Sequence, residues 1–503
     1  MRKIAILAVA GAVMLPAWAV SGELSRQDIQ WLDRVTYGPT TGTVEEYRKL
    51  GRRRFLDEQL HPRGLQLSQP VAAEIDALEI AHTNTADLLI SVSKEQQRIN
   101  TLPDDTQKQP ARKALNDRGN KLAYEAARRE LLRALYSPAQ LQEQMTWFWL
   151  NHFSVFQYKG NDPWLVGDYA ERAIRPNALG HFRDLVMATL THPAMLQYLD
   201  NAQNAAGHIN ENYARELMEL HTLGVGSGYT QQDIQELARV LTGVGINNSG
   251  NEPKLKPQWQ PLYKHQGAFE FNPARHDFGT VTLLGKPLDG GDGFGEVEQA
   301  VDLLVAQPAC AQFVSRKLAT YFVSDSPPRS LTDRMAKTFQ KSHGDIAAVL
   351  QTMFESREFT ASLGAKFKDP MHFVVSTLRL AYDGKPILNT HPVVNWLNAL
   401  GEPLFGRQTP DGYPLIEGGW ASSGQISRRF EIARAIGSGN SGLFDPEDGT
   451  AATTTGFPQL STRLYYAAVE PFLSSKARTA LDRASSQLEW NTFLLASPDF
   501  NYR

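Results

Sequence analysis

Helical periodicity constrains the fold of this chain more than any other feature of its sequence. Apolar residues recur at spacings of three and four through most of its length, and helix-start signals precede many of these stretches. Alternation of apolar and polar residues, the pattern of a half-buried strand, is scarce. The sequence therefore predicts a mainly α fold: a large multi-helix globular domain with a small β-hairpin insertion.

Capping signals place the individual helices. Ser137-Pro138-Ala139-Gln140 reads as a capping box with proline at the first helical position, and its helix runs toward His152. Thr230 with Asp233 caps another helix, which ends before Gly243. Further helices are predicted at residues 177–191, 295–306, 309–322, 330–341, 345–355 and 370–382.

Two segments break this pattern. Residues 91–133 are rich in Lys, Arg, Glu and Gln, which predicts a long solvated helical hairpin turned at Leu102-Pro103-Asp104-Asp105. Between residues 243 and 295 Gly, Pro and Asn become frequent instead. Two short alternating stretches in this part, FEF from Phe269 and TVTLLG from Thr280, predict a β-hairpin. A long excursion of this kind inside a compact domain is often functional.

The first residues have the pattern of an export signal. Arg2 and Lys3 precede an apolar run from Ile4 to Pro16, and Ala17-Trp18-Ala19 supplies small residues at the two positions that a signal peptidase reads. The run is shorter than the roughly 20 apolar residues of a membrane anchor. We therefore expect cleavage near Val20 and a mature protein that is periplasmic or extracellular.

Composition limits the partners. Cys310 is the single cysteine among 503 residues, so an exported chain of this size would hold together without an intramolecular disulfide. The 51 basic and 54 acidic residues give a net charge of −3, which offers no electrostatic reason to expect nucleic acid or an anionic membrane as a partner. No segment after the signal is apolar enough to predict an integral membrane span.

These observations divide the chain into four regions. The predicted regions are a signal peptide at 1–19, an N-terminal helical region with the charged helical hairpin at 20–135, a helical core with the signature motifs and a β-hairpin loop (about 245–295) at 136–385, and a C-terminal helical region with Gly/Pro-rich loops at 386–503. Loops of the last region, such as Pro410–Pro414, could rim a cleft.

The stretch from Asn210 to Gly224, NENYARELMELHTLG, carries the densest set of candidate site residues. At about 100° per residue, its apolar residues share one face of a helix, opposite a face of charged residues. Arg215 lies four residues from both Glu211 and Glu219, so one guanidinium could bridge two carboxylates. A solvated, salt-bridged surface would explain this face. If a neighbouring helix covers it, Glu216 or Glu219 becomes a buried carboxylate suited to general acid or base work.

Other polar residues allow both structural and functional interpretations. His152 ends an aromatic helix and could cap its carbonyl groups or face a site. Asp200-Asn201 could form a turn or contact a ligand, and the loop pair His276-Asp277 could orient an imidazole or hold a metal. The candidate catalytic residues are Glu216, Glu219, Arg215, His276 and Asp277, and the candidate ligand-binding residues are His152, Asp200, Asn201, Asn210, Glu211 and Asn212.

Several reaction classes can be weighed against these residues. A mixed metal set from His152, Glu216, Glu219 and His276 is permitted, but the signature lacks the usual spacing of helix-borne ligands and implies no particular cofactor. The chain has no G-x-S-x-G elbow and no phosphate loop, which disfavours serine hydrolases and nucleotide enzymes. Paired carboxylates with abundant Trp and Tyr suit sugar stacking and glycosidic protonation, although the same aromatic residues could simply fill the core.

A series of motifs runs along the chain. It comprises LDRVTYGPT from Leu32, FWLNHFSV around His152, NALGHFRDLV, HPAMLQYLDN, the signature, HDFG at His276 and LASPDFNYR at the end. Together they resemble the bacterial exported family known as domain of unknown function 1800, over nearly the whole mature chain. The resemblance implies an exported bacterial protein, often encoded beside a partner of the alkaline-phosphatase-like exported class, and it brings no established reaction.

We therefore predict an exported protein that binds or acts on an extracellular or envelope polymer, with polysaccharide favoured. The predicted site is a polar cleft where the helix from Asn210 to Glu219, the end of the His152 helix and the His276 loop meet. One of the signature glutamates would act as acid or base, and Arg215 would hold charge. The alternatives are a non-enzymatic partner-binding protein of envelope assembly and a metal-dependent enzyme.

Overall fold

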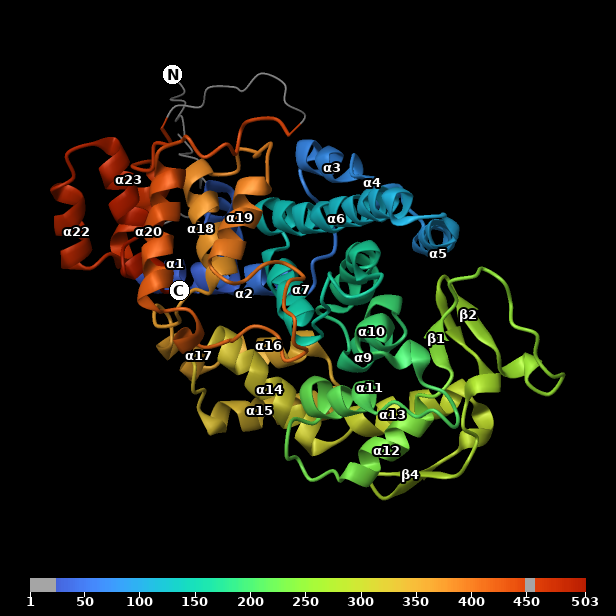
Figure 1. Ribbon diagram of the computed structural model, residues 1–503. Helices are drawn as coiled ribbons and strands as arrows, with labels where there is room; N and C mark the ends of the chain where they lie inside the picture. The colour runs from blue at the N-terminus through green and yellow to red at the C-terminus, as the bar shows by residue number, and fades with distance from the viewer. Residues whose placement is uncertain (1–23, 448–456) are drawn as a thin grey trace, which may run out of the picture.

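Helices build most of the molecule (Figure 1). The computed structural model describes residues 24–447 and 457–503. Within these ranges the strands form only two small antiparallel sheets, so the predicted mainly α fold is confirmed. The predicted signal peptide, residues 1–19, lies outside the described residues.

The elements follow one another in this order. The N-terminal helices are α1 (Arg26–Val35), α2 (Thr41–Leu60), α3 (Gln69–Asp76), α4 (Glu79–His82), α5 (Thr85–Thr101), α6 (Asp105–Tyr136) and α7 (Gln140–His152). The next are α8 (Val166–Asp168), α9 (Phe182–Leu190), α10 (Pro193–Tyr198), α11 (Asn212–Glu216), α12 (Gln231–Val240), α13 (Phe294–Val305), α14 (Pro308–Phe322), α15 (Arg329–Lys341), α16 (Ile346–Phe354), α17 (Arg357–Ala361) and α18 (Pro370–Tyr382). The last are α19 (His391–Ala399), α20 (Ser423–Gly437), α21 (Arg463–Ala468), α22 (Ser475–Asp482) and α23 (Gln487–Leu495). The strands are β1 (Val244–Ile246), β2 (Lys264–Gln266), β3 (Phe269–Phe271), β4 (Val281–Leu283) and β5 (Lys286–Leu288).

All parts of the chain pack around one core. In Figure 1 the C-terminal helices α20, α22 and α23 lie at one end beside α18, and β1 and β2 lie at the opposite end. The helices α14, α15 and α16 pack against one another below α7. One large cluster of buried apolar side chains draws on the N-terminal, middle and C-terminal parts of the described chain.

The helices α5 and α6 form the predicted helical hairpin, with its turn at residues 102–104. Most of the first half of α6 is exposed, but from Leu122 to its end nearly every residue is buried. The solvated role predicted for residues 91–133 is therefore wrong for the second half of α6. Charged residues can be buried there because distant partners meet them, as when Arg133 Nη1 contacts Glu171 Oε2 at 2.5 Å.

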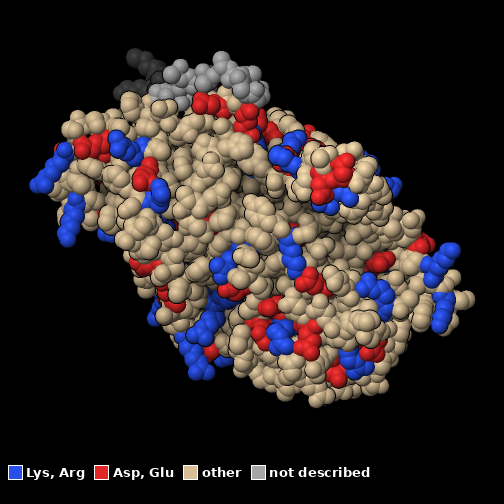
Figure 2. Space-filling model, in the orientation of Figure 1, with Lys and Arg blue, Asp and Glu red and all other residues tan. Residues whose placement is uncertain are grey.

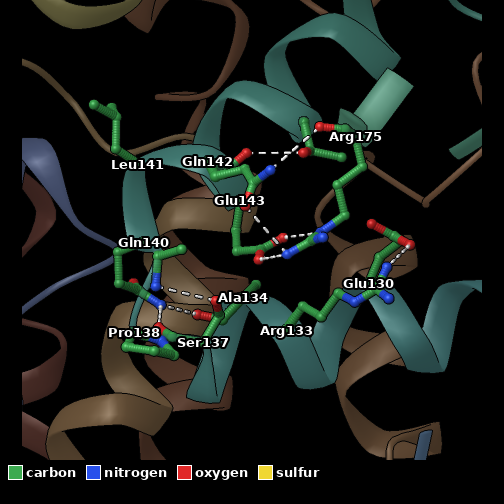
Figure 3. Close-up of polar contacts among 12 residues, drawn as sticks. Glu130, Arg133, Ala134, Ser137, Pro138, Gln140, Leu141, Gln142, Glu143 and Arg175 are labelled. Atoms are coloured by element: carbon green, nitrogen blue, oxygen red, sulfur yellow. Dashed lines mark hydrogen bonds and ion pairs between the residues drawn. The ribbon is translucent and has the colours of Figure 1, made fainter. Parts of the chain in front are cut away.

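Paired charges also fix the junction of α6 and α7 (Figure 3). Arg175 Nη2 lies 2.7 Å from Oε1 of the buried Glu143. Gln140 Nε2 donates to the backbone carbonyl groups of Ala134 at 3.0 Å and Ser137 at 2.8 Å. Because each of these buried polar groups is hydrogen-bonded, the cost of removing it from water is offset.

The strands correct the predicted β-hairpin. The FEF stretch forms β3, which pairs antiparallel with β1 and β2, whereas the TVTLLG stretch contributes β4, whose partner is β5. The single hairpin predicted within residues 245–295 is therefore wrong. Each stretch pairs instead across an adjacent two-residue turn, at Gly267-Ala268 or Leu284-Gly285, and these turns close much shorter loops.

The signature does not form one continuous α-helix. The helix α11 ends at Glu216, and Leu217–Thr222 continue the chain as a π-helix. The predicted charge bridge is present: Arg215 Nη2 lies 2.9 Å from Glu211 Oε2, and Arg215 Nη1 lies 3.6 Å from Glu219 Oε1. π-Helical turns inside helices occur frequently at functional sites. Glu216 stands at the point where the helix changes.

Candidate functional site

An open groove beside α11 carries Glu216, and we call it the Glu216 groove. Its volume is about 440 Å³, within the roughly 300–1,000 Å³ of small-molecule sites. Aromatic, amide and charged side chains line it: Phe156, Tyr158, Lys159, Tyr198, Leu199, Asn212, Glu216, Gln408 and Pro410.

The segment that follows α7 forms the aromatic wall of the groove. Tyr158 is 64% exposed, and its ring meets that of Phe156 edge-on with centroids 5.3 Å apart. The neighbouring Lys159 Nζ contacts Asp200 Oδ2 at 2.8 Å. Asp200 follows α10 and has a left-handed backbone with φ of 60°, a conformation that Asp adopts more readily than most residues. The ion pair therefore ties the segment of Tyr158 to the turn between α10 and α11.

Glu216 is a half-buried carboxyl group without a hydrogen-bond or ion-pair partner among the described residues. The adjacent Arg215 contacts Glu211 and Glu219 instead. Burial raises the pKa of Glu216, the Glu219 carboxylate raises it further, and Arg215 opposes both effects. Glu216 therefore keeps its proton to a higher pH than a solvated glutamate and can donate that proton to a bound molecule.

A loop of the C-terminal region, residues 403–413, closes the groove. Gln408 and Pro410 line it, and Tyr198 Oη donates to the carbonyl oxygen of Gln408 at 2.9 Å. The expectation that Pro410–Pro414 could rim a cleft is thus confirmed for Pro410. Gln408 was not a predicted site residue, because nothing local in the sequence brings this loop to α11.

His152 lies behind the signature and does not line the groove. Its Nε2 is 2.9 Å from the carbonyl oxygen of His221, and the two rings have centroids 5.9 Å apart. Burial lowers the pKa of both imidazoles, that of His221 to about 3, and the nearby Lys317 disfavours their protonation further. Both histidines are therefore uncharged at neutral pH and pack the interior behind the π-helical turn.

His276 and Asp277 are adjacent in sequence but make separate contacts, and neither lines the Glu216 groove. His276 Nε2 lies 3.3 Å from Glu296 Oε2, and both side chains are fully buried. His276 Nδ1 is 2.9 Å from the carbonyl oxygen of Thr242. Asp277 Oδ2 accepts a hydrogen bond from Arg239 Nε at 2.9 Å. The predicted cleft therefore does not include the His276 loop, and Glu296 is a partner that the sequence did not indicate.

The asparagine candidates mainly hold the backbone. Asn201 Nδ2 donates to the carbonyl oxygen of Val244 at 2.9 Å, and Asn210 Oδ1 accepts from the Asn212 backbone at 3.0 Å. Of the predicted site residues, Asn212 and Glu216 line the groove. The sequence thus located the site through its signature but not through its other motifs.

The geometry also bears on metals and membranes. In residues 24–447 and 457–503, no three His, Cys, Asp or Glu side chains are placed to hold a metal ion together. The mixed set considered from His152, Glu216, Glu219 and His276 is therefore not assembled. Across the same ranges, every helix is too short or too polar to cross a membrane.

A larger groove lies beside β2, and we call it the β2 groove. Its volume is about 840 Å³, and it runs between the start of α5, the start of α10 and the turn from β2 to β3. His192 in its wall has both ring nitrogens engaged: Nδ1 accepts from Ala194 N at 3.1 Å, and Nε2 lies 3.1 Å from Asp168 Oδ2. None of the predicted site residues lines this groove.

Comparison with known proteins adds a family but no activity. The family described as Protein of unknown function (DUF1800) matches residues 30–502. Comparisons with curated proteins and with solved structures find no match. The matched range contains both grooves. On the face shown in Figure 2, acidic and basic side chains are interspersed.

Proposed function

The chain belongs to the family of proteins of unknown function DUF1800, and we propose that it binds a polysaccharide in the Glu216 groove. One observation carries the proposal: the exposed ring of Tyr158 lines the same groove as the unpaired carboxyl group of Glu216 and the amide of Gln408. An aromatic ring can pack on the apolar face of a sugar. Carboxyl and amide groups can donate to and accept from its hydroxyl groups.

The shape of the groove fits a polymer better than an enclosed small molecule. Its aromatic wall and its polar residues come from three distant segments, namely those of Tyr158, α11 and Gln408. The groove is open to solvent, so a chain longer than the groove can continue past either end. This arrangement supports a ligand that is bound along part of its length.

An exported location belongs to the same proposal. Envelope and extracellular polysaccharides lie where a cleaved export signal at residues 1–19 would deliver the protein. The alkaline-phosphatase-like exported partner stays a prediction.

The test is a binding measurement with defined polysaccharides: dextran, xylan, alginate, chitosan and peptidoglycan. Tyr158→Ala should weaken binding of the preferred polymer by about tenfold, because aromatic packing contributes on the order of 1 kcal/mol beyond the area it buries. The matched control is Tyr466→Ala, at a tyrosine that is 57% exposed and does not line the groove. Absence of binding to every polymer, or equal loss in both variants, would contradict the proposal.

A second candidate function, capture of an extended segment of a partner protein, is favoured by β2. This strand is fully exposed, pairs on one side with β3 and lines the β2 groove. The pair Gln266↔Phe269 closes a two-residue turn, so the N–H and C=O groups of His265 point to the open edge, where another strand can pair. His265→Pro removes that N–H group. Co-purification of the alkaline-phosphatase-like partner with the wild type but not with this variant supports the function, and equal recovery opposes it.

A further inference from the structure

Asp411 brings a second carboxyl group to the Glu216 groove. It follows Pro410, which lines the groove together with Glu216. Two contacts fix its position: Arg407 Nη2 lies 2.9 Å from both Asp411 oxygens, and Thr409 Oγ1 donates to Asp411 Oδ1 at 2.6 Å. Glu216, by contrast, has no such contact among the described residues. One groove therefore joins a carboxyl group that is free to react with one that is held in place.

The loop that carries Asp411 is itself anchored. Tyr413 N donates to Asn151 Oδ1 at 2.5 Å, and Asn151 Nδ2 donates to the carbonyl oxygen of Tyr413 at 3.1 Å. The ring of Tyr413 also lies 5.8 Å from the guanidinium carbon of Arg407. These contacts connect the loop to the end of α7, so Asp411 is presented by a braced segment.

The surroundings drive the two carboxyl groups to opposite protonation states. Burial, Glu219 and Asp411 raise the pKa of Glu216, and among the neighbouring charges only Arg215 opposes them. Burial alone would raise the pKa of Asp411, but the hydrogen bonds from Thr409 and Arg407 outweigh it and lower that pKa. Lys317 and the Tyr198 hydroxyl also face Asp411, and Tyr198 faces Glu216 as well. Between the two pKa values Glu216 holds a proton while Asp411 is ionised. Two carboxyl groups separated in this way are the usual arrangement for acid catalysis beside a charge-stabilising carboxylate.

We propose that Glu216 and Asp411 together hydrolyse a glycosidic bond of the bound polysaccharide. This inference rests on the proposed binding function. The bond between the anomeric carbon and the bridging oxygen breaks, and that oxygen takes the proton of Glu216. The Asp411 carboxylate stabilises the positive charge that develops on the anomeric carbon. A water molecule then forms the new carbon–oxygen bond and returns a proton to Glu216, so the residue ends as it began.

The experiment measures binding and release of new reducing ends with the same dextran, xylan, alginate, chitosan and peptidoglycan. Glu216→Gln keeps the shape of the side chain but cannot donate the proton, so the rate should fall by about 10²- to 10⁴-fold. Asp411→Asn keeps acceptors for Arg407 and Thr409 but removes the charge, and the rate should fall by about 10²-fold or more. Affinity should stay within about threefold in both variants. The matched controls, Glu431→Gln and Asp482→Asn, lie outside the groove and should leave the rate unchanged.

The pH profile supplies a readout that a structural role would not move. The wild-type rate should fall at high pH as Glu216 loses its proton and at low pH as Asp411 gains one. Binding without release of reducing ends, or equal rates in the wild type and both variants, would overturn the hydrolytic inference and leave the binding function standing. Failure to bind any of the polymers would overturn both.

Discussion

Replacing His221 by phenylalanine should stabilise the protein, and the gain should grow as the pH falls. Both ring nitrogens of His221 are buried without a hydrogen-bond partner, and burial lowers its pKa from 6.5 to about 3. The unfolded chain therefore takes up a proton near pH 6.5, which the folded protein excludes until about pH 3. Stability is lost across this window, and phenylalanine, which cannot titrate, removes that loss. The ring of Phe153, with its centroid 5.0 Å away, already provides aromatic surroundings.

The size of the effect follows from the two pKa values. Proton uptake by the unfolded chain alone favours unfolding by about 2 kcal/mol at pH 5 and by about 0.2 kcal/mol at pH 7. An unpaired buried polar group adds a cost of about 1–3 kcal/mol that depends little on pH in this range. The variant should therefore be more stable by roughly 1–3 kcal/mol at pH 7 and by about 2 kcal/mol more at pH 5.

Equilibrium unfolding in urea at the two pH values measures this difference. His61→Phe is the control, because the His61 side chain is 56% exposed and its replacement should change the pH dependence little. A stability gain in His221→Phe that is the same at pH 5 and pH 7 would refute the reasoning, since His221 would then take up its proton as readily in the folded protein as in the unfolded chain.

Three further predictions use the same unfolding assay. Arg503→Met should cost about 3–5 kcal/mol, because the buried guanidinium donates to Gln144 Oε1 at 3.1 Å; a loss below about 1 kcal/mol would show that this network adds little. Arg215→Met should change stability by less than about 1 kcal/mol, since its ion pairs are partly exposed, and a larger loss would contradict that view. His276→Ala should cost about 3–5 kcal/mol by leaving Glu296 buried alone, yet leave polysaccharide affinity unchanged; weaker binding by the folded variant would place His276 in the site.

Local signals in the sequence predicted the helices well. The capping box of Thr230 and Asp233 is present with both of its hydrogen bonds, and the helix expected at residues 370–382 is α18. These features depend on residues a few positions apart. The predictions that failed concern contacts between distant residues, such as the burial of Arg133 against Glu171 and the pairing of β3 and β4 with other strands.

The same distinction explains how much of the site could be predicted. The signature supplied Glu216 and its raised chance of burial, because helix periodicity places side chains on faces. Tyr158, Gln408 and Asp411 come from segments whose arrival at α11 no local pattern records. His276 attracted attention as a loop histidine, but its partner Glu296 sits on α13 and makes a buried ion pair away from the groove.

The most direct test of the central claim is a crystal structure of the Glu216→Gln variant with an oligosaccharide cut from the polymer that binds best. The proposed function predicts a sugar ring against the exposed face of Tyr158, with a glycosidic oxygen within hydrogen-bond reach of residue 216 and Gln408 contacting a hydroxyl group. Sugar bound only in the β2 groove, or elsewhere on the surface with the Glu216 groove empty, would contradict it.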